Sequence, residues 1–183
     1  MRELSLNILD IVMNSVEAEA TRIILVVEEI ASRNLIRIRI RDNGRGMSDE
    51  LKARVLDPFV TTRTTRSVGM GLSLFRQIAV ACNGDLTLTS MLGKGTTVTI
   101  TLKLNHLNRP PMGQIADSIV NLIMGSLDIH FCYFHSTESG RLRFDSYWMF
   151  GRMAERDCSI YDMSAIARDH LNAELERIRA RLY

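Results

Sequence analysis

Isoleucine and arginine alternate along one segment, and this alternation most constrains the fold. Residues 35–42 read LIRIRIRD, so apolar branched side chains alternate with charged ones. A strand with this pattern buries one face and leaves the other in water, which requires a second layer over the isoleucine side. The strand runs directly into residues 42–47, DNGRGM, where a carboxylate is followed by two glycines. An acid beside such permissive main chain raises the question of what the loop binds.

Helical and extended periodicities alternate over the first 104 residues. Ser48 followed by two acids is typical of a helix start, and Asn83-Gly84 is typical of a helix end. The predicted elements are a helix over 3–18, an antiparallel strand pair over 21–31 and 35–42, a short helix over 48–55, a loop over 57–71, a helix over 72–82 and a hairpin over 85–104.

The composition changes after residues 105–112, which we interpret as a linker between two domains. Residues 113–183 are predicted to form a small α+β domain of unknown role, with a helix up to residue 125, strands over 128–135 and 140–150, and a terminal helix over 162–182. Its aromatic residues could anchor a protein partner, although packing inside a small domain explains them equally well. The terminal helix could form a homodimer or pack on its own domain.

The charge of the chain is nearly balanced. The formal net charge is +2, and 20 of the 23 basic residues are arginine, most of them beside acids or on one strand face. No apolar run approaches the ~18 residues of a membrane span, and no signal peptide follows Met1. We therefore expect a cytoplasmic protein that binds neither nucleic acid nor membranes.

The cysteines and histidines show no recognisable ligand spacing. Cys82, Cys132 and Cys158 are odd in number and far apart, so the sequence predicts neither disulfides nor a zinc site. His130 and His135 fall in or beside a predicted strand, where packing or exposure is favoured over metal binding.

An acid and a carboxamide lie four residues apart in the first predicted helix. Asp10 and Asn14 therefore share one helical face. A neutral oxygen can hold Mg²⁺ while a carboxylate orients or deprotonates an attacking group. Taken alone, this pair favours a solvated helix face.

Three loops add further candidate ligands. Asp42 can accept a hydrogen bond from the exocyclic amine of adenine, and Gly44 and Gly46 allow the backbone to approach a flat ring, although Asp-Asn-Gly is also a common turn. Residues 69–71, GMG, open a helix whose N-terminus can bind phosphates. Residues 57–63, DPFVTTR, could close over those phosphates, or form only a polar loop.

The order of these motifs resembles that of the GHKL ATPases, the superfamily of gyrase B, heat-shock chaperones, histidine kinases and MutL. The resemblance covers about residues 4–104, and its last motif is GKGTT at 93–97. It implies an α/β fold of the Bergerat type, a two-layer sandwich with a mixed sheet, that binds ATP or ADP with Mg²⁺. The closest resemblance is to histidine kinase ATP-binding domains, while residues 14–23 are more similar to MutL-type ATPases.

The resemblance also assigns roles to residues. It makes Asp10 the catalytic residue, as general base or water-orienting group, Asn14 the Mg²⁺ ligand, Asp42 the contact to adenine and Thr97 its supporting hydroxyl. The complete implied nucleotide-binding set is Asn14, Ala18, Asp42, Gly44, Gly46, Met47, Thr61, Thr62, Arg63, Gly69, Met70, Gly71, Leu72 and Thr97.

Two departures affect the expected activity. Asp10 stands where hydrolysing members have Glu and histidine kinases often have Asn, and Ser67 stands where kinases usually have Gly. Few residues precede the first motif and no histidine lies before His106, so ordinary autophosphorylation is not expected. The chain is interpreted as a regulatory ATP/Mg²⁺-binding ATPase that hydrolyses ATP or uses it to control a protein partner. The alternatives are an anti-sigma-like kinase that phosphorylates a partner in trans and a non-catalytic ATP sensor.

Overall fold

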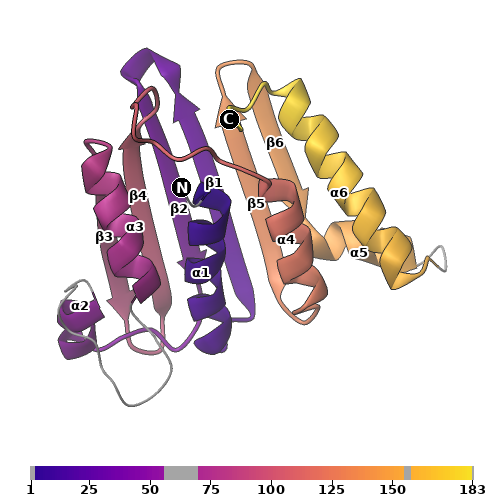
Figure 1. Ribbon diagram of the computed structural model, residues 1–183. Helices are drawn as coiled ribbons and strands as arrows, with labels where there is room; N and C mark the ends of the chain where they lie inside the picture. The colour runs from indigo at the N-terminus through magenta and orange to yellow at the C-terminus, as the bar shows by residue number, and fades with distance from the viewer. Residues whose placement is uncertain (1–2, 56–69, 155–157, 183) are drawn as a thin grey trace.

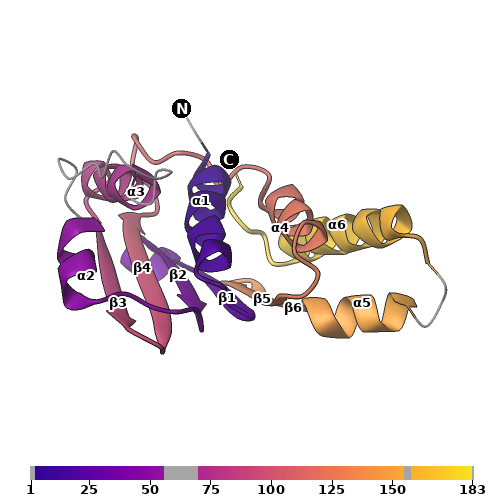
Figure 2. The same cartoon turned by 90° about the horizontal axis from the view of Figure 1, so that it is seen from below.

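A single mixed sheet organises the chain in the computed structural model, which describes residues 3–55, 70–154 and 158–182 (Figure 1). Its strands lie in the order β3 (Asp85–Met91), β4 (Gly95–Lys103), β2 (Leu35–Asp42), β1 (Arg22–Ile30), β5 (His130–Thr137) and β6 (Gly140–Asp145). Figure 2 shows the helices α1, α3, α4 and α6 on one side of this sheet. The predicted two-layer α/β architecture is therefore confirmed.

The helices match the periodicity of the sequence closely. The predicted helices over 3–18, 48–55 and 72–82 are confirmed, and Asn83 takes the left-handed φ of 56° expected of a C-terminal cap. The helices are α1 (Leu4–Glu17), α2 (Asp49–Val55), α3 (Met70–Ala81), α4 (Ile115–Met124), α5 (Ser146–Ala154) and α6 (Ile160–Arg177), and a 3-10 turn, η1 (Ala31–Arg33), joins β1 to β2.

The alternating segment forms β2 and behaves as predicted. Ile36, Ile38 and Ile40 are at most 1% exposed, and their partners in the register are apolar residues of β1 and β4, except for Glu29 of β1 opposite Ile36. Ile38, for example, lies between Val27 and Ile100. The isoleucine side therefore faces the helix layer, and burial of each such side chain contributes roughly 1.5–3 kcal/mol.

The second half of the chain extends the sheet of the first half. Strand β5 pairs in parallel with β1, with Phe131 opposite Ile23, and β6 pairs antiparallel with β5. This parallel pairing covers an edge of β1 that would otherwise expose unpaired backbone groups. The division into domains at 1–104 and 113–183 stays a prediction, but strands on both sides of it belong to one sheet.

One predicted element is wrong. Residues 140–150 were expected to form a single strand, but β6 ends at Asp145 and Ser146 begins α5. The carboxylate of Asp145 accepts a hydrogen bond from Trp148 N at 3.2 Å, which caps the first turn of the helix. The aromatic residues favoured a strand by propensity, and the cap overrides that preference.

A buried polar chain ties the C-terminal segment to the sheet. The Glu29 carboxylate on β1 lies 2.9 Å from His135 Nε2 on β5, and His135 Nδ1 lies 2.6 Å from the Tyr133 hydroxyl. The backbone N–H of Arg181, beyond α6, also donates to Glu29. All three side chains are nearly inaccessible to water, and burial raises the pKa of the Tyr133 phenol. These hydrogen bonds of Glu29, His135 and Tyr133 therefore join β1, β5 and the C-terminal segment.

Among the helices that the structure describes, none combines the length and the apolar character that a membrane crossing requires.

Candidate functional site

Asp42 is the centre of a buried hydrogen-bonded group at the end of β2. It is 8% exposed, and its Oδ1 accepts hydrogen bonds from Gly44 N at 2.9 Å and from Thr96 N at 3.1 Å. Its Oδ2 accepts from the Ser15 hydroxyl of α1 at 2.9 Å. A carboxylate has about four acceptor positions, so these three bonds fix its orientation and leave one position for a ligand.

The loop after Asp42 packs directly against the end of α1. A Cβ atom on Gly44 would lie 2.7 Å from the carbonyl oxygen of Ala18 and 2.9 Å from its Cβ. The same carbonyl accepts a hydrogen bond from Arg45 N at 2.9 Å. Glycine is therefore required at position 44 because α1 and the loop approach each other too closely for a side chain.

The other side of the loop is held by the β3–β4 hairpin. Gly46 has a φ of +67°, and a Cβ there would lie 2.0 Å from the Met91 carbonyl oxygen. Met47 N donates to the Ser90 hydroxyl at 2.9 Å, and Ser90 lies 2.9 Å from the hydroxyl of Thr96. The loop is thus clamped between α1 and the hairpin, which fixes the direction of Asp42.

The candidate residues for catalysis and Mg²⁺ binding, Asp10 and Asn14, lie on α1, N-terminal to the part of it that contacts the Asp42 loop. Asp10 is exposed and Asn14 is half-buried, and neither side chain has a hydrogen-bonding partner in the part of the chain that the structure describes. A Cβ on Gly71, in the first turn of α3, would lie 3.2 Å from Asp10 Cβ. The predicted Mg²⁺ and catalytic pair therefore lies beside the N-terminus of α3, where the helix dipole favours anions.

One face of α1 connects these two groups. Asp10, Asn14 and Ala18 are spaced by four residues, so they lie along one side of α1 over roughly 12 Å. Ala18 contacts the loop of Asp42, and Asp10 contacts the start of α3. The arrangement can hold a ligand with a hydrogen-bond donor at one end and negative charge at the other.

The structure distinguishes two adjacent threonines of β4. Thr97, which the resemblance places at the adenine site, is paired with Arg41, and strand alternation places its side chain on the face away from α1. Thr96 is 7% exposed and donates its backbone N–H to Asp42. The role of Thr97 stays a prediction, whereas Thr96 is the residue in contact with the carboxylate.

Sequence reasoning missed Ser15, Ser90 and Thr96. Thr96 could have been identified from the strand alternation, because it lies two and four residues before the inward-facing Val98 and Ile100 and so shares their face. Ser15 and Ser90 have no comparable signal, since their contacts join segments 27 and 43 residues apart.

The remaining candidates are backbone contacts or lie outside the described residues. Leu72 is 2% exposed, so its side chain belongs to the core and only its backbone could contact a ligand. Thr61, Thr62, Arg63 and Gly69, together with the side chain of Met70, lie outside the described part of the chain.

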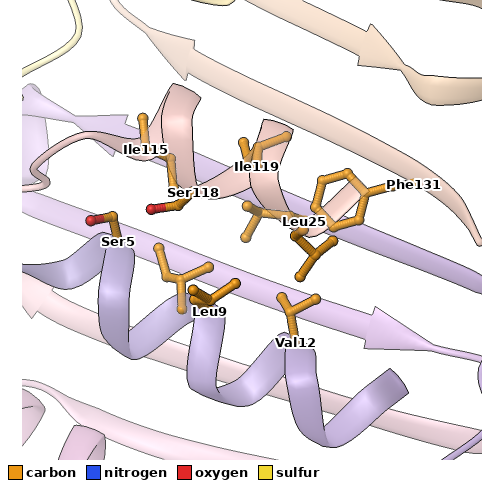
Figure 3. Close-up of a pocket in the computed structure, with 10 residues that line it drawn as sticks. Ser5, Leu9, Val12, Leu25, Ile115, Ser118, Ile119 and Phe131 are labelled. Atoms are coloured by element: carbon orange, nitrogen blue, oxygen red, sulfur yellow. The ribbon is translucent and has the colours of Figure 1, made fainter. Parts of the chain in front are cut away.

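A small apolar cleft between α1 and α4 is a separate feature (Figure 3). Leu9 and Val12 line it from α1, Ile119 lines it from α4, and Leu25 and Phe131 lie at its base. It opens on the side of α1 that packs against α4, and its lining does not include Asp10, Asn14 or Asp42. We therefore interpret it as a packing seam.

Residues 1–106 match the family model described as histidine kinase-, DNA gyrase B- and HSP90-like ATPase. Among curated relatives, the signal transduction histidine-protein kinase AtoS of Escherichia coli (strain K12) is 35% identical over 95 residues, which are 45% of this chain and 16% of that protein. The sensor histidine kinase ZraS of the same organism is 26% identical over 106 residues, 58% of this chain and 23% of that protein. The chain thus covers only a small part of the length of these relatives.

Solved structures show the same fold at low sequence identity. The Aquifex aeolicus MutL ATPase domain complexed with ADP has a TM-score of 0.50 and 15% identity, covering 76% of this chain and 62% of that one. The N-terminal domain of a DNA repair protein has a TM-score of 0.54 and 18% identity, covering 79% of this chain and 52% of that one.

Proposed function

Because the chain belongs to the family of histidine kinase-, DNA gyrase B- and HSP90-like ATPases, we propose that it binds ATP or ADP with Mg²⁺ and uses ATP hydrolysis to control a protein partner. One observation carries this proposal. Three buried donors hold the Asp42 carboxylate in one orientation, and one of its acceptor positions remains for a ligand. Adenine presents an exocyclic amine, a donor that suits this position.

The residues on and around α1 have separate roles in this proposal. Asp42 binds the adenine amine, and the N-terminus of α3 binds the phosphates through its N–H groups and dipole. Asn14 would hold Mg²⁺ through its neutral oxygen, and the bound ion would supply positive charge beside the phosphates. Asp10, one turn earlier, orients a water molecule or takes its proton. Asp10 and Asn14 fit this task because neither side chain has a competing partner among the described residues.

The proposed protein partner binds near the C-terminal half of the chain. Tyr147 and Trp148 on α5 are 53% and 61% exposed, and Tyr161 on α6 is 83% exposed. Exposed aromatic side chains of this kind commonly act as binding anchors. We also propose a cytoplasmic setting, without contact to membranes or nucleic acid, and a homodimer through α6 as an alternative to a different partner.

A kinase acting in trans is the second candidate. It is favoured by the identity of 35% to a signal transduction histidine-protein kinase. A non-catalytic sensor is the third, because Asp10 is one methylene shorter than the Glu of hydrolysing members and its reach to water is reduced.

Replacing Asp10 with Asn tests the proposed chemistry. We expect release of labelled phosphate from ATP to fall at least ~100-fold, because the variant can neither orient nor deprotonate water as a carboxylate does. ADP affinity should change less than about threefold, because Asp10 acts on water and not on the nucleotide. Phosphate release and calorimetric ADP binding measure the two effects.

The matched control is Glu17→Gln, which removes an exposed acid from the last turn of the same helix. It should leave both measurements unchanged. Equal phosphate release from Asp10→Asn and the unmodified chain would contradict the role of Asp10. Nucleotide binding without turnover would support the sensor, and label on an added partner protein would support the kinase.

A further inference from the structure

Three side chains of different chemistry converge where β5 and β6 meet α5. His130 and Cys132 are two residues apart on β5, so they point to the same face of the sheet. Asp145, the last residue of β6, is the direct cross-strand partner of Cys132. The intervening Phe131 faces the helix layer (Figure 3), so the three side chains lie on the opposite face, away from α1 and α4.

The atoms of this group meet at one point. His130 Nε2 lies 3.0 Å from Asp145 Oδ1 and 3.4 Å from Cys132 Sγ, and Cys132 Sγ lies 3.8 Å from Asp145 Oδ2. Zinc has bonds of about 2.0–2.2 Å to nitrogen and oxygen and about 2.3 Å to sulfur, so tetrahedral ligand atoms lie roughly 3.3–3.7 Å apart. The Nε2–Sγ separation of 3.4 Å falls in this range, and the separations to the two carboxylate oxygens of Asp145 lie just below and just above it. One ligand atom from each residue lies within 4.8 Å of the others.

The geometry does not suit a nucleophilic triad. In such a triad the acid orients the histidine through one ring nitrogen while the other nitrogen takes the proton of the nucleophile. Here Asp145 and Cys132 both approach Nε2 of His130. Because the carboxylate and the thiol approach the same nitrogen, the arrangement suits a shared cation and does not leave separate ring nitrogens for the acid and the nucleophile.

Neighbouring groups hold the three side chains in place. The His130 ring is stacked on Tyr147 with centroids 4.4 Å apart, and the Tyr147 hydroxyl donates to the Asp128 carbonyl at 3.0 Å. Asp145 is fixed because it caps α5 through Trp148 N. Such outer contacts are what orients ligands in metal sites.

The group is partly accessible to water. Cys132 is 3% exposed, whereas the side chains of His130 and Asp145 are 23% and 22% exposed. Arg22 on β1 also reaches the thiol, and its charge opposes a cation. Because Arg22 is exposed, its side chain can move into solvent when an ion binds.

We propose that His130, Cys132 and Asp145 form a binding site for one divalent transition-metal ion of the zinc class, with three protein ligands and a fourth position open to water. Nitrogen, thiolate and carboxylate are all accepted zinc ligands, and a thiolate selects against Mg²⁺. The ion joins β5, the end of β6 and the start of α5. The site lies on the sheet face away from α1, so it is separate from the proposed nucleotide site.

Titration with cobalt(II) tests the site in the full chain, stripped of metal and free of nucleotide. Cobalt(II) replaces zinc in such sites, and its bond to a thiolate gives a charge-transfer band in the near ultraviolet. We expect this band to saturate at one ion per chain and to disappear when zinc is added. Cys132→Ser should abolish the band.

Two further variants separate ligation from folding. Asp145→Asn keeps a residue type that caps helices well, and it should keep the charge-transfer band while weakening zinc at least about tenfold. His130→Gln should weaken zinc to a similar degree. The control variants Cys158→Ser and His170→Gln, which lie outside the group, should bind as the unmodified chain does. Circular dichroism establishes that each variant is folded.

The proposal is overturned if the folded, unmodified chain gives no saturable cobalt band. It is equally overturned if the band survives in Cys132→Ser or is lost in Cys158→Ser.

Discussion

Replacing Asp42 with Ala should weaken binding of adenine nucleotides at least ~100-fold, or about 3 kcal/mol. The variant loses the acceptor for the adenine amine, and it leaves Gly44 N, Thr96 N and the Ser15 hydroxyl without their shared partner. A buried donor without a partner costs roughly 1–3 kcal/mol, so the loop also loses its fixed orientation. Calorimetric titration with ADP and Mg²⁺ measures the loss.

Asp42→Asn separates recognition of the base from support of the loop. The amide keeps one oxygen for Gly44 N and Thr96 N, and its NH₂ group can donate to the Ser15 hydroxyl. The amide then presents a donor to the base. Affinity for adenine nucleotides should fall, because adenine also presents a donor there. Affinity for guanine nucleotides should rise relative to adenine nucleotides, because guanine presents an oxygen. Asp85→Ala, an exposed acid on β3, is the control and should bind ADP normally. Unchanged ADP affinity in both Asp42 variants would contradict the assignment.

Replacing Glu29 with Ala should lower the free energy of unfolding by about 3–5 kcal/mol. The substitution removes the carboxylate that lies 2.9 Å from His135 Nε2 and accepts the Arg181 N–H, in a site only 6% exposed. His135 and Tyr133 then keep their buried hydrogen bond to each other, but Nε2 of His135 loses its partner among the described residues. Urea denaturation, followed by circular dichroism and by Trp148 fluorescence, measures the change.

Glu28→Ala is the matched control on the same strand. Glu28 pairs with Arg37 at 3.2 Å, and both side chains are 30% exposed. A pair in contact with solvent contributes less than ~1 kcal/mol, so this variant should stay close to the unmodified chain. If the two variants lose equal stability, the buried hydrogen bonds of Glu29 do not hold the C-terminal segment to the sheet.

Local patterns predicted the first half of the fold well. The alternation of isoleucine and arginine identified the buried face of β2, and Asn83-Gly84 identified the end of α3. These predictions succeed because strand alternation and helix caps both depend on residues that lie close together in the sequence. The parallel pairing of β5 with β1 has no such signal, since it joins residues more than 100 positions apart.

Three features of the structure were not predicted from the sequence. Strand β4 carries Thr96 and Thr97 side by side, and the family resemblance pointed to Thr97, whereas the alternation with Val98 and Ile100 places Thr96 on the face of Asp42. The start of α5 depends on Asp145, whose capping role outweighs the strand propensity of the aromatic residues after it. The cluster of His130, Cys132 and Asp145 was not predicted because its third member comes from the partner strand of a hairpin.

The most direct test of the central claim is calorimetric titration of the unmodified chain with ADP and with GDP, each in the presence of Mg²⁺. The free acceptor position of Asp42 predicts one ADP site, at least about tenfold tighter than GDP, because adenine offers a donor where guanine offers an oxygen. Absence of ADP binding by the folded chain, or equal affinity for the two nucleotides, would contradict the proposed site.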